Sequence, residues 1–300
     1  MIPAAESAIP AYDAGFVLGA TISEQLRTFG GRLFKLDEHL ARLRRGLEIA
    51  GISVDHATTQ LERHAEELVA ANFRRLDPAD DLGLSIFVTP GPYATLAPPH
   101  VPRRPTIGMS TFPLPFHLWA DKYDRGERLA VSRIRQVAEE SWPREMKCRS
   151  RMHYYLAEQE LRDRGLAARP LLLDERGFVN ETPTANLVAF ADVGPHGELW
   201  MPRREKVLFG ISLQTALDLA DRALRIREFG SGDSSPERLA ADYREVWLTS
   251  TPFCALPVTH VDDAPVGDGR PGPVFKKLLD AWSTNVGVDI AAQACRFAAR

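Results

Sequence analysis

The chain has 300 residues, enough for one large domain or two ordinary ones with a sizeable core. Its hydrophobic content of 44% and charged content of 26% are typical of globular proteins, and a net charge of −3 gives no basic footprint for nucleic acid. No apolar run approaches the roughly 20 residues of a membrane helix, and the N-terminus lacks the pattern of a signal peptide. Three unclustered cysteines predict neither a disulfide framework nor a metal site such as a zinc centre. We therefore expect a cytoplasmic protein that binds neither nucleic acid nor membranes.

The first third of the chain predicts a β-hairpin followed by helices and strands. Apolar alternation on both sides of Gly30-Gly31 is typical of two strands joined by a tight turn. The sequence H-L-A-R-L at residues 39–43 lies on a helix with Asp37 as its expected N-cap and Gly51 as its stop. We expect one further helix and two strands, over residues 58–73, 82–89 and 106–111.

The middle of the chain centres on Lys147, in the sequence M-K-C-R-S-R-M-H-Y-Y-L-A-E-Q-E-L. It lies between a loop broken at Trp142-Pro143 and an amphipathic helix that is expected to run to Gly165. A hairpin follows in L-L-L-D-E-R-G-F-V-N-E, with Glu181 closing its second strand. A lysine in a basic loop is usually a solvated surface residue, so its role depends on what the rest of the chain supplies.

The last third predicts a helix and a strand whose ends carry polar groups. A helical stripe of apolar residues runs from Leu213 to Leu224, with Ser212 as its expected N-cap. The G-I-S sequence there would present free backbone N–H groups at a helix N-terminus, which favours a bound anion. A strand is expected from Glu245, and it ends in the hydroxyl-rich turn L-T-S-T-P.

Four motifs in this order resemble those of the class IV pyridoxal-phosphate aminotransferases, the fold-type IV family. That family includes branched-chain and D-amino-acid aminotransferases and aminodeoxychorismate lyase. The motifs are a D-x-G…G…E…R series from Asp13 to Arg27, H-x-x-R-L, a lysine followed nine residues later by L-A-x-Q-E, and a glutamate five residues before an asparagine. The resemblance extends over about residues 13–282. It implies an α+β fold with a small N-terminal α/β domain, a larger C-terminal β-barrel-like domain and the cofactor at their interface. The implied division is residues 1–113, a linker at 114–119, and residues 120–300.

The resemblance also implies the cofactor, pyridoxal 5′-phosphate, and a role for each matching residue. Lys147 would form a Schiff base with it, and the neighbouring cations Arg149 and Arg151 would favour the deprotonated, nucleophilic amine. Arg42 would bind the phosphate, because the planar fork of guanidinium donors matches phosphate oxygens. Glu181 would face the pyridine nitrogen and keep it protonated. Further implied cofactor contacts are Ile211, Ser212, Ser250 and Thr251, and candidate contacts to substrate or cofactor are Glu24, Arg27, Arg151 and Asn186.

Three positions depart from the usual pattern of the family. Ser23 replaces an aromatic residue, Ser150 replaces an asparagine, and Thr182 replaces a glycine. These departures leave open a non-enzymatic relative that acts as a binding or structural protein. Retention of the lysine, the arginine and the glutamate favours an enzyme instead. We expect His39 to be a structural hydrogen-bonding residue and not a catalyst.

Two activities are compatible with the motifs. An aminotransferase is favoured, because transaminases of the family carry a glutamate at the position of Glu24. The alternative is a carbon–carbon lyase of the aminodeoxychorismate type, which releases 4-aminobenzoate and pyruvate, because such lyases commonly have an arginine at the position of Arg151. The expected partners are an amino donor, a 2-oxo acid, and a second copy of the chain in a homodimer. Substrate identity, including a preference for L-, D- or non-α-amino groups, cannot be read from the sequence.

Overall fold

A computed structural model describes residues 1–54, 57–230 and 234–299. Contacts within the chain divide it into two units. The first comprises Met1–Leu114 with Glu145–Arg151, and the second comprises Pro115–Arg144 with Met152–Arg300. The sequence predicts contiguous domains, whereas the segment that carries Lys147 groups with the N-terminal unit because it pairs with the sheet of that unit. Among the described residues, no helix combines the length and apolar character needed to cross a membrane.

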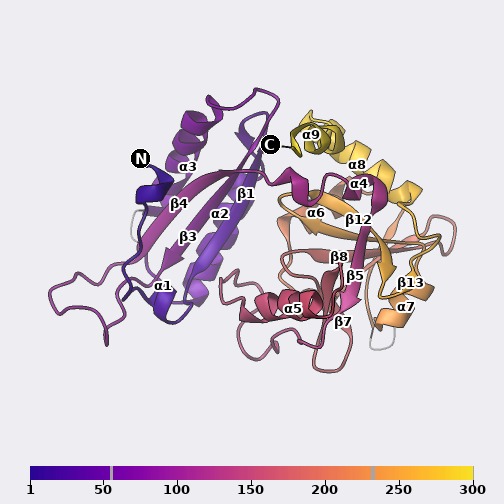
Figure 1. Cartoon of the computed structure of the whole chain (residues 1–300), viewed down its shortest axis with the longest axis horizontal. Coiled ribbons are helices and arrows are strands. Elements are labelled where there is room, and N and C mark those ends of the chain that lie inside the picture. Colours follow the sequence, from indigo (N-terminus) through magenta and orange to yellow (C-terminus); the bar gives the residue numbers. More distant parts are fainter. Residues whose placement is uncertain (55–56, 231–233, 300) are drawn as a thin grey trace. The chain divides into compact units, whose positions relative to one another are not determined.

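The first unit is built on a four-stranded antiparallel sheet with the order β2-β1-β3-β4 (Figure 1). The predicted Gly-Gly hairpin is confirmed: Gly30 and Gly31 have φ of 56° and 76°, which glycine adopts without steric cost. The predicted strand over residues 82–89 is also confirmed. The strands are β1 (Ile22–Phe29), β2 (Arg32–Leu33), β3 (Leu82–Thr89) and β4 (Thr106–Pro113).

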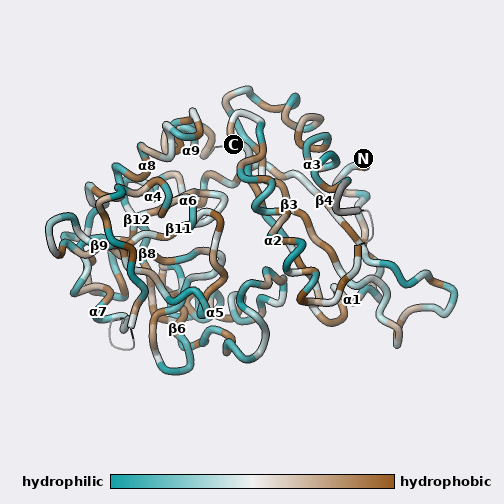
Figure 2. The backbone as a smooth tube through the Cα atoms, turned by 180° about the vertical axis from the view of Figure 1, so that it is seen from behind, coloured by the Kyte–Doolittle hydropathy of each residue, from teal (hydrophilic) through white to brown (hydrophobic). Residues whose placement is uncertain are grey.

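Helices α2 and α3 pack on one face of this sheet. Leu40, Leu43 and Leu47, spaced at helical intervals on α2, bury against Ile22 and Leu26 of β1. In Figure 2, hydrophobic segments, in brown, alternate with hydrophilic ones along the strands and helices of this unit. The helix begins earlier than expected, after a left-handed Lys35, so the predicted N-cap lies within the first turn. The helical elements are η1 (Ala4–Glu6), α1 (Ala14–Val17), α2 (Leu36–Ile49) and α3 (Ala57–Phe73).

The second unit is built on a nine-stranded mixed sheet with the order β10-β9-β8-β11-β12-β5-β6-β7, in which β13 also pairs with β12. The predicted hairpin is confirmed, since β6 and β7 pair antiparallel with Glu181 opposite Leu172. Its strands are β5 (Glu127–Val131), β6 (Arg169–Leu173), β7 (Val179–Glu181), β8 (Asn186–Ala191), β9 (Glu198–Met201), β10 (Arg225–Glu228), β11 (Glu245–Ser250), β12 (Cys254–Val261) and β13 (Ala264–Pro265).

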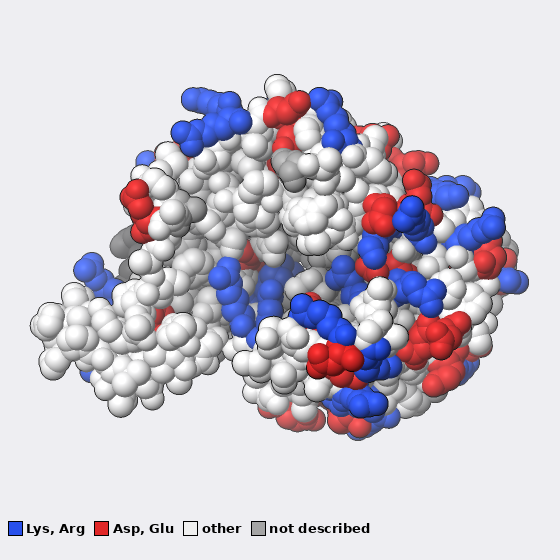
Figure 3. Space-filling view, in the orientation of Figure 1, with Lys and Arg blue, Asp and Glu red and all other residues white. Residues whose placement is uncertain are grey.

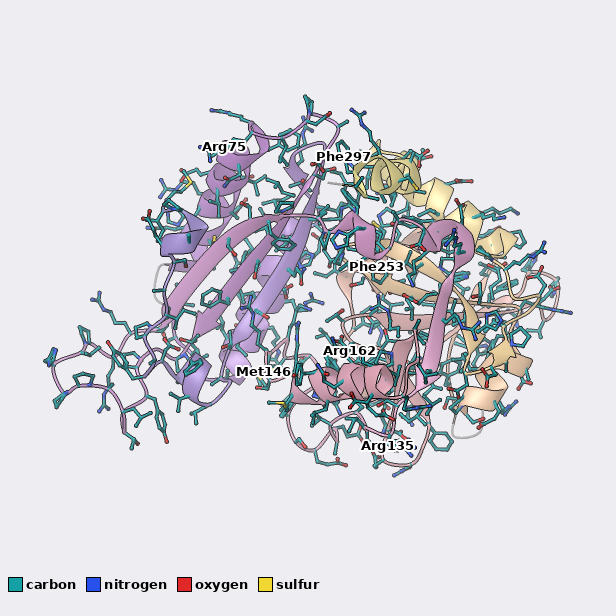
Figure 4. All side chains as sticks on the ribbon, in the orientation of Figure 1. Arg75, Arg135, Met146, Arg162, Phe253 and Phe297 are labelled. Carbon is teal, nitrogen blue, oxygen red and sulfur yellow. The ribbon has the colours of Figure 1, made fainter. Side chains whose placement is uncertain are left out.

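Helices and aromatic side chains complete the second unit. Phe116 packs against Trp119 and Phe297, and Trp119 packs against Phe253. Two of these rings, Phe253 and Phe297, are labelled in Figure 4. On the face drawn in Figure 3, acidic and basic side chains of this unit are interspersed. The helices are η2 (Phe116–Leu118), α4 (Lys122–Arg125), α5 (Met152–Asp163), η3 (Arg204–Lys206), α6 (Ile211–Leu219), α7 (Pro236–Ala241), α8 (Pro273–Val286) and α9 (Ile290–Phe297).

The helix predicted after the G-I-S sequence is shorter than expected. Its N-cap is Gly210 and not Ser212, and α6 ends at Leu219. Leu224 lies beyond the helix, directly before β10. The predicted helix was too long because the residues that connect α6 to β10 are also partly apolar, so the pattern of apolar residues does not stop where the helix ends.

Candidate active site

The segment around Lys147 pairs with the start of β1 through an isolated β-bridge between Ile22 and Cys148. The Ser23 amide donates to the Lys147 carbonyl at 2.9 Å, and the Arg149 amide donates to the Thr21 carbonyl at 2.9 Å. Cys148 lies between them and packs against the apolar core of the first unit. The backbone on both sides of Cys148 is thus hydrogen-bonded to the main chain at the start of β1.

The D-x-G motif and Ser150 shape the turn next to this segment. Asp13 accepts hydrogen bonds from the Gly15 amide at 2.7 Å and from the Thr106 hydroxyl at 2.6 Å, so it closes α1 onto β4. The Ser150 hydroxyl donates to the Gly19 carbonyl at 2.9 Å. The serine that replaces the usual asparagine therefore has a hydrogen bond within the first unit.

Glu24 lies at the centre of a buried ionic group. Its carboxylate accepts from Arg42 Nε at 2.7 Å and from Arg42 Nη2 at 2.8 Å, in the two-pronged geometry that guanidinium groups favour. The same carboxylate is 2.7 Å from His39 Nδ1, which must donate because an ionised carboxylate can only accept. Residues from two separate motifs, one on β1 and one on α2, thus form one group.

The electrostatics of this group follow from its burial. Burial by itself would raise the pKa of Glu24, but the charge and hydrogen bonds of Arg42, with those of His39, lower that pKa to about 2. Burial lowers the pKa of His39, and the charges of Arg42 and Lys147 act in the same direction against the opposing effect of Glu24. Near neutral pH, Glu24 is therefore ionised and His39 neutral. The histidine acts as a hydrogen-bond donor, as the sequence predicted.

Arg27 and Arg151 lie outside this ionic group. Arg27 is buried on β1, where its guanidinium stacks 4.1 Å from the centre of the Phe29 ring and Nε donates to the Thr28 carbonyl at 3.2 Å. Arg151 Nε donates to the Cys148 carbonyl at 3.3 Å. The substrate or cofactor contacts predicted for these two arginines stay predictions.

In the second unit, Glu181 is buried at the end of β7. Its Oε1 accepts a hydrogen bond from the Tyr154 hydroxyl at 2.6 Å and another from the Gln136 amide group. Nothing in the spacing of the sequence identified Gln136 or Tyr154, because these side chains come from a loop and from α5. Together they hold the carboxylate in one orientation.

Asn186 positions the start of α6. Its amide group donates to the Leu208 carbonyl at 2.9 Å, and its Oδ1 accepts from the Gly210 amide at 3.1 Å. A Cβ at position 210 would lie 2.3 Å from that oxygen, so this turn requires glycine. Asn186 therefore fixes the loop before α6 within its own unit.

The turn after Glu181 explains how threonine replaces the usual glycine. Thr182 pairs with Ala185 across the turn, and the residue with a left-handed backbone is Thr184, with φ of 64°. The Ser250 hydroxyl at the end of β11 donates to the Thr184 carbonyl at 2.8 Å. Because Thr182 does not need the left-handed conformation, its side chain is compatible with this backbone.

The polar groups near the end of β11 have the chemistry of an anion site. No side chain caps α6, so the backbone N–H groups of its first turn, at Ile211 and Ser212, are available as donors. Helix α6 packs against β11, which ends at Ser250 before Thr251. Thr249 Oγ1 is buried and, within the described part of the chain, has no hydrogen-bond partner. Backbone amides and hydroxyls without a carboxylate among them suit a phosphate group.

The L-A-E-Q-E motif on α5 has a structural role. Glu160 accepts from the Ser132 hydroxyl at 2.6 Å, from the Arg133 amide at 3.0 Å and from Arg164 at 3.1 Å. It ties α5 to the loop after β5, the loop that also carries Gln136.

A family model described as "Amino-transferase class IV" matches residues 21–261. The chain belongs to this family. The D-alanine aminotransferase of Bacillus licheniformis is 28% identical over 284 residues, which cover 94% of this chain and 93% of the relative. A branched-chain amino acid aminotransferase of T.th., solved with pyridoxamine 5′-phosphate, has a TM-score of 0.80 at 21% identity and covers 95% of this chain and 92% of that one. The 4-amino-4-deoxychorismate lyase of Pseudomonas aeruginosa has a TM-score of 0.75 at 27% identity, over 94% and 96% of the two chains.

These likenesses confirm the predicted family and the predicted two-domain α+β fold. Class IV aminotransferases depend on pyridoxal 5′-phosphate, so this class IV aminotransferase is a pyridoxal-phosphate-dependent enzyme. The residues present fit that cofactor. The first unit holds a lysine on a segment that is hydrogen-bonded to the start of β1, and the second holds an oriented carboxylate and a helix N-terminus without a side-chain cap.

Proposed function

We propose that this class IV aminotransferase moves an amino group between an amino acid and a 2-oxo acid, with Lys147 as the residue that bonds covalently to the cofactor. The observation that carries the proposal is the buried group that Glu24 of β1 forms with Arg42 and His39 of α2. The Lys147 segment is hydrogen-bonded to the same strand, at Ser23. Burying a carboxylate and an arginine together carries a penalty in desolvation free energy. We infer that the pair is kept because it holds the guanidinium of Arg42 in one orientation.

Bound pyridoxal phosphate supplies an electron-withdrawing ring that stabilises negative charge at the α-carbon of the substrate. Within that chemistry, Lys147 would be the residue that takes the proton from the α-carbon of the substrate and holds it for return. Its backbone is held by hydrogen bonds to β1, which limits where its amine can reach. Lys147 is therefore both the covalent anchor and the base.

The other proposed residues bind and orient. Glu181, held by Gln136 and Tyr154, keeps a proton on the pyridine nitrogen. Arg42, held by Glu24, contributes a guanidinium to the phosphate, so Glu24 is a positioning residue and does not contact substrate. The remaining proposed phosphate contacts are Ile211, Ser212 and Thr251. Ser250, whose hydroxyl donates to the Thr184 carbonyl, would orient the turn that carries Thr251.

The competing activity is carbon–carbon cleavage of the aminodeoxychorismate lyase type. Arg151 and the 27% identity to the lyase of Pseudomonas aeruginosa favour it. We weight Glu24 more, because Arg151 donates to a carbonyl of its own segment and would serve either reaction. We also propose that the enzyme works as a cytoplasmic homodimer, as the resemblance to the family implies.

The first prediction concerns the covalent bond to Lys147. Borohydride reduction of the purified enzyme, followed by peptide mass mapping, should place a pyridoxyl group on Lys147, because the lysine keeps its register with the downstream motif. Reconstituted Lys147→Ala is the control and should carry no label. Label on another lysine in the parent enzyme would remove the basis of the proposal.

The second prediction separates transfer from cleavage. The enzyme is mixed with candidate amino acids and no oxo acid, and the absorption spectrum is followed. Transfer leaves the cofactor as its amine form, and a 2-oxo acid should restore the aldehyde form. Consumption of aminodeoxychorismate to aminobenzoate and pyruvate, without the amine form, would show that the lyase alternative is right.

A further inference from the structure

The side chain of Arg149 crosses the first strand of the N-terminal sheet. Its Nη2 donates to the hydroxyl of Ser85 on β3 at 2.6 Å, and its guanidinium carbon is 5.1 Å from the centre of the Phe87 ring. The backbone of Arg149, however, is paired beside β1, at Thr21. Since β1 lies between that edge and β3, the side chain must pass over β1.

The residue beneath this crossing is Ser23. Its amide bonds to the carbonyl of Lys147, and its partner across β1 and β3 is Phe87, over which the guanidinium of Arg149 lies. Ser23 is one of the three positions at which this chain departs from the family pattern, where an aromatic residue is usual. A serine leaves room for the arginine, whereas an aromatic ring at this position would occupy the path of its side chain.

Arg149 and Lys147 emerge on the same face of the sheet. Cys148, between them, packs into the core on the opposite face, and side chains alternate along an extended segment. Residues two apart in such a segment are separated by roughly 7 Å. A small molecule that reacts at the lysine can therefore reach the arginine.

The charge at this place is not neutralised within its own unit. Among the described residues of the first unit, no carboxylate forms an ion pair with Arg149 or Arg151, whose partners are a hydroxyl and a carbonyl oxygen. Burial, and then the charge of Arg151, lower the pKa of Arg149. Two neighbouring cations that repel each other are stabilised when an anion binds between or beside them.

We propose that Arg149, seated on Ser85 and Phe87 across Ser23, binds a carboxylate of the substrate and so selects amino acids over simple amines. The guanidinium of Arg149 forms no ion pair with a described carboxylate of its unit. It can therefore offer two parallel N–H donors to the carboxylate of a substrate. The proposal rests on the amino-group transfer proposed above and adds the specificity-determining residue.

The primary test is binding of carboxylic acids that lack an amino group. Propionate and glutarate are titrated calorimetrically into the cofactor-loaded parent enzyme and into Arg149→Leu, Arg149→Lys, Ser23→Phe and Arg44→Leu. We expect Arg149→Leu to weaken binding about ten- to a hundredfold, the effect of losing a hydrogen-bonded charge. Arg44, an exposed arginine on α2, is the matched control and should leave binding unchanged.

Ser23→Phe tests the crossing itself. It keeps Arg149 but fills the path of its side chain, so it should weaken carboxylate binding as much as Arg149→Leu does. Equal binding of carboxylates by the parent and Arg149→Leu, or full binding by Ser23→Phe, would overturn the proposal. If Arg149→Leu loses the cofactor spectrum or the far-ultraviolet circular dichroism of the parent, Arg149→Lys and Ser23→Phe decide.

A kinetic arm separates this inference from the proposed function. The ratio of kcat/KM for each enantiomer of alanine to that for ethylamine is compared between parent and Arg149→Leu, and it should fall about ten- to a hundredfold. If Arg149→Leu still transfers amino groups and its ratio is unchanged, the proposal for Arg149 is wrong and the proposed function stands. If borohydride does not label Lys147 in the parent enzyme, the proposed function is wrong, irrespective of the results for the Arg149 variants.

Discussion

At the residue scale, Glu24 and Arg42 must be considered as a pair. The Glu24 carboxylate is fully buried and accepts hydrogen bonds from two nitrogens of the Arg42 guanidinium, so each side chain determines the orientation of the other. Removing either one leaves a buried charge without its main partner, which is generally more costly than removing both. Substitutions at these positions therefore need both a binding and a stability measurement.

The third prediction is that Arg42→Ala weakens pyridoxal phosphate binding about ten- to a hundredfold, as expected for loss of a charge-assisted contact to phosphate. Arg44→Ala is the control and should be nearly neutral, because that side chain is exposed. Arg45→Ala should also be nearly neutral, since its ion pair with Glu145 is exposed. Affinities are measured by fluorescence titration of cofactor-free protein, with urea unfolding in parallel. Equal effects at all three positions would mean that the H-x-x-R-L match has no functional meaning.

The fourth prediction concerns the acid stability that Glu24 provides. Its pKa is lowered from 4.5 to about 2 in the folded protein, so its contribution is full above pH 4.5 and is lost as the pH falls towards 2. A shift of this size corresponds to a contribution on the order of 3 kcal/mol. Glu24→Gln should therefore be less stable than the parent at pH 7, and the gap should narrow between pH 5 and 3. Urea unfolding at several pH values measures it, and a gap independent of pH would contradict the assignment.

At the scale of elements, the sheets position helices through single buried side chains. Glu245 of β11 accepts from the Val274 amide at 2.8 Å and from the Phe275 amide at 2.7 Å, and Trp247 also donates to it. It thus caps α8 from outside the helix, at the end where a negative charge is favoured. The close approach of Gly272, where a Cβ would lie 2.1 Å from the carboxyl carbon, allows this geometry.

The fifth prediction is that Glu245→Gln lowers the free energy of unfolding by about 2–3 kcal/mol, because an amide nitrogen would face a backbone N–H donor. Glu158→Gln, at an exposed position on α5, should change it by less than about 0.5 kcal/mol. Urea unfolding gives both values. Hydrogen exchange should also show faster exchange of the amides at Val274 and Phe275 in Glu245→Gln, and unchanged exchange there would contradict the cap.

At the scale of the whole molecule, the chain passes between its two units more than once. The Lys147 segment returns to the first unit after Pro115–Arg144 have contributed to the second. The candidate cofactor residues are divided accordingly, with Lys147 and Arg42 in the first unit and Glu181 in the second. The order of residues along the chain therefore does not match their assignment to units.

Self-association is the remaining property at this scale. Phe16 and Leu18, on or next to α1, are 76% and 58% exposed. If the enzyme is the homodimer that we propose, sedimentation equilibrium should give twice the mass of the chain. A single monomeric species at all concentrations would contradict it.

Several secondary-structure elements of this protein could be predicted from short stretches of its sequence. The Gly30-Gly31 hairpin and the strand over residues 82–89 follow from residues that are neighbours in the chain, so alternation and turn chemistry predict them. The spacing of motifs around Lys147 predicted the family and its cofactor. Both were implied by the resemblance of these motifs to those of the family, and both are confirmed.

Only the tertiary structure decided which side chains meet. Gln136 and Tyr154 hold Glu181 from 45 and 27 residues away in the sequence, and no periodicity encodes such pairs. The start of α6 was misplaced at Ser212 because the cap preference of serine is a local rule, whereas Asn186 of β8 fixes the turn at Gly210. Contacts between distant residues depend on how strands and helices pack, and their free energy is a property of the folded arrangement and not of any single stretch.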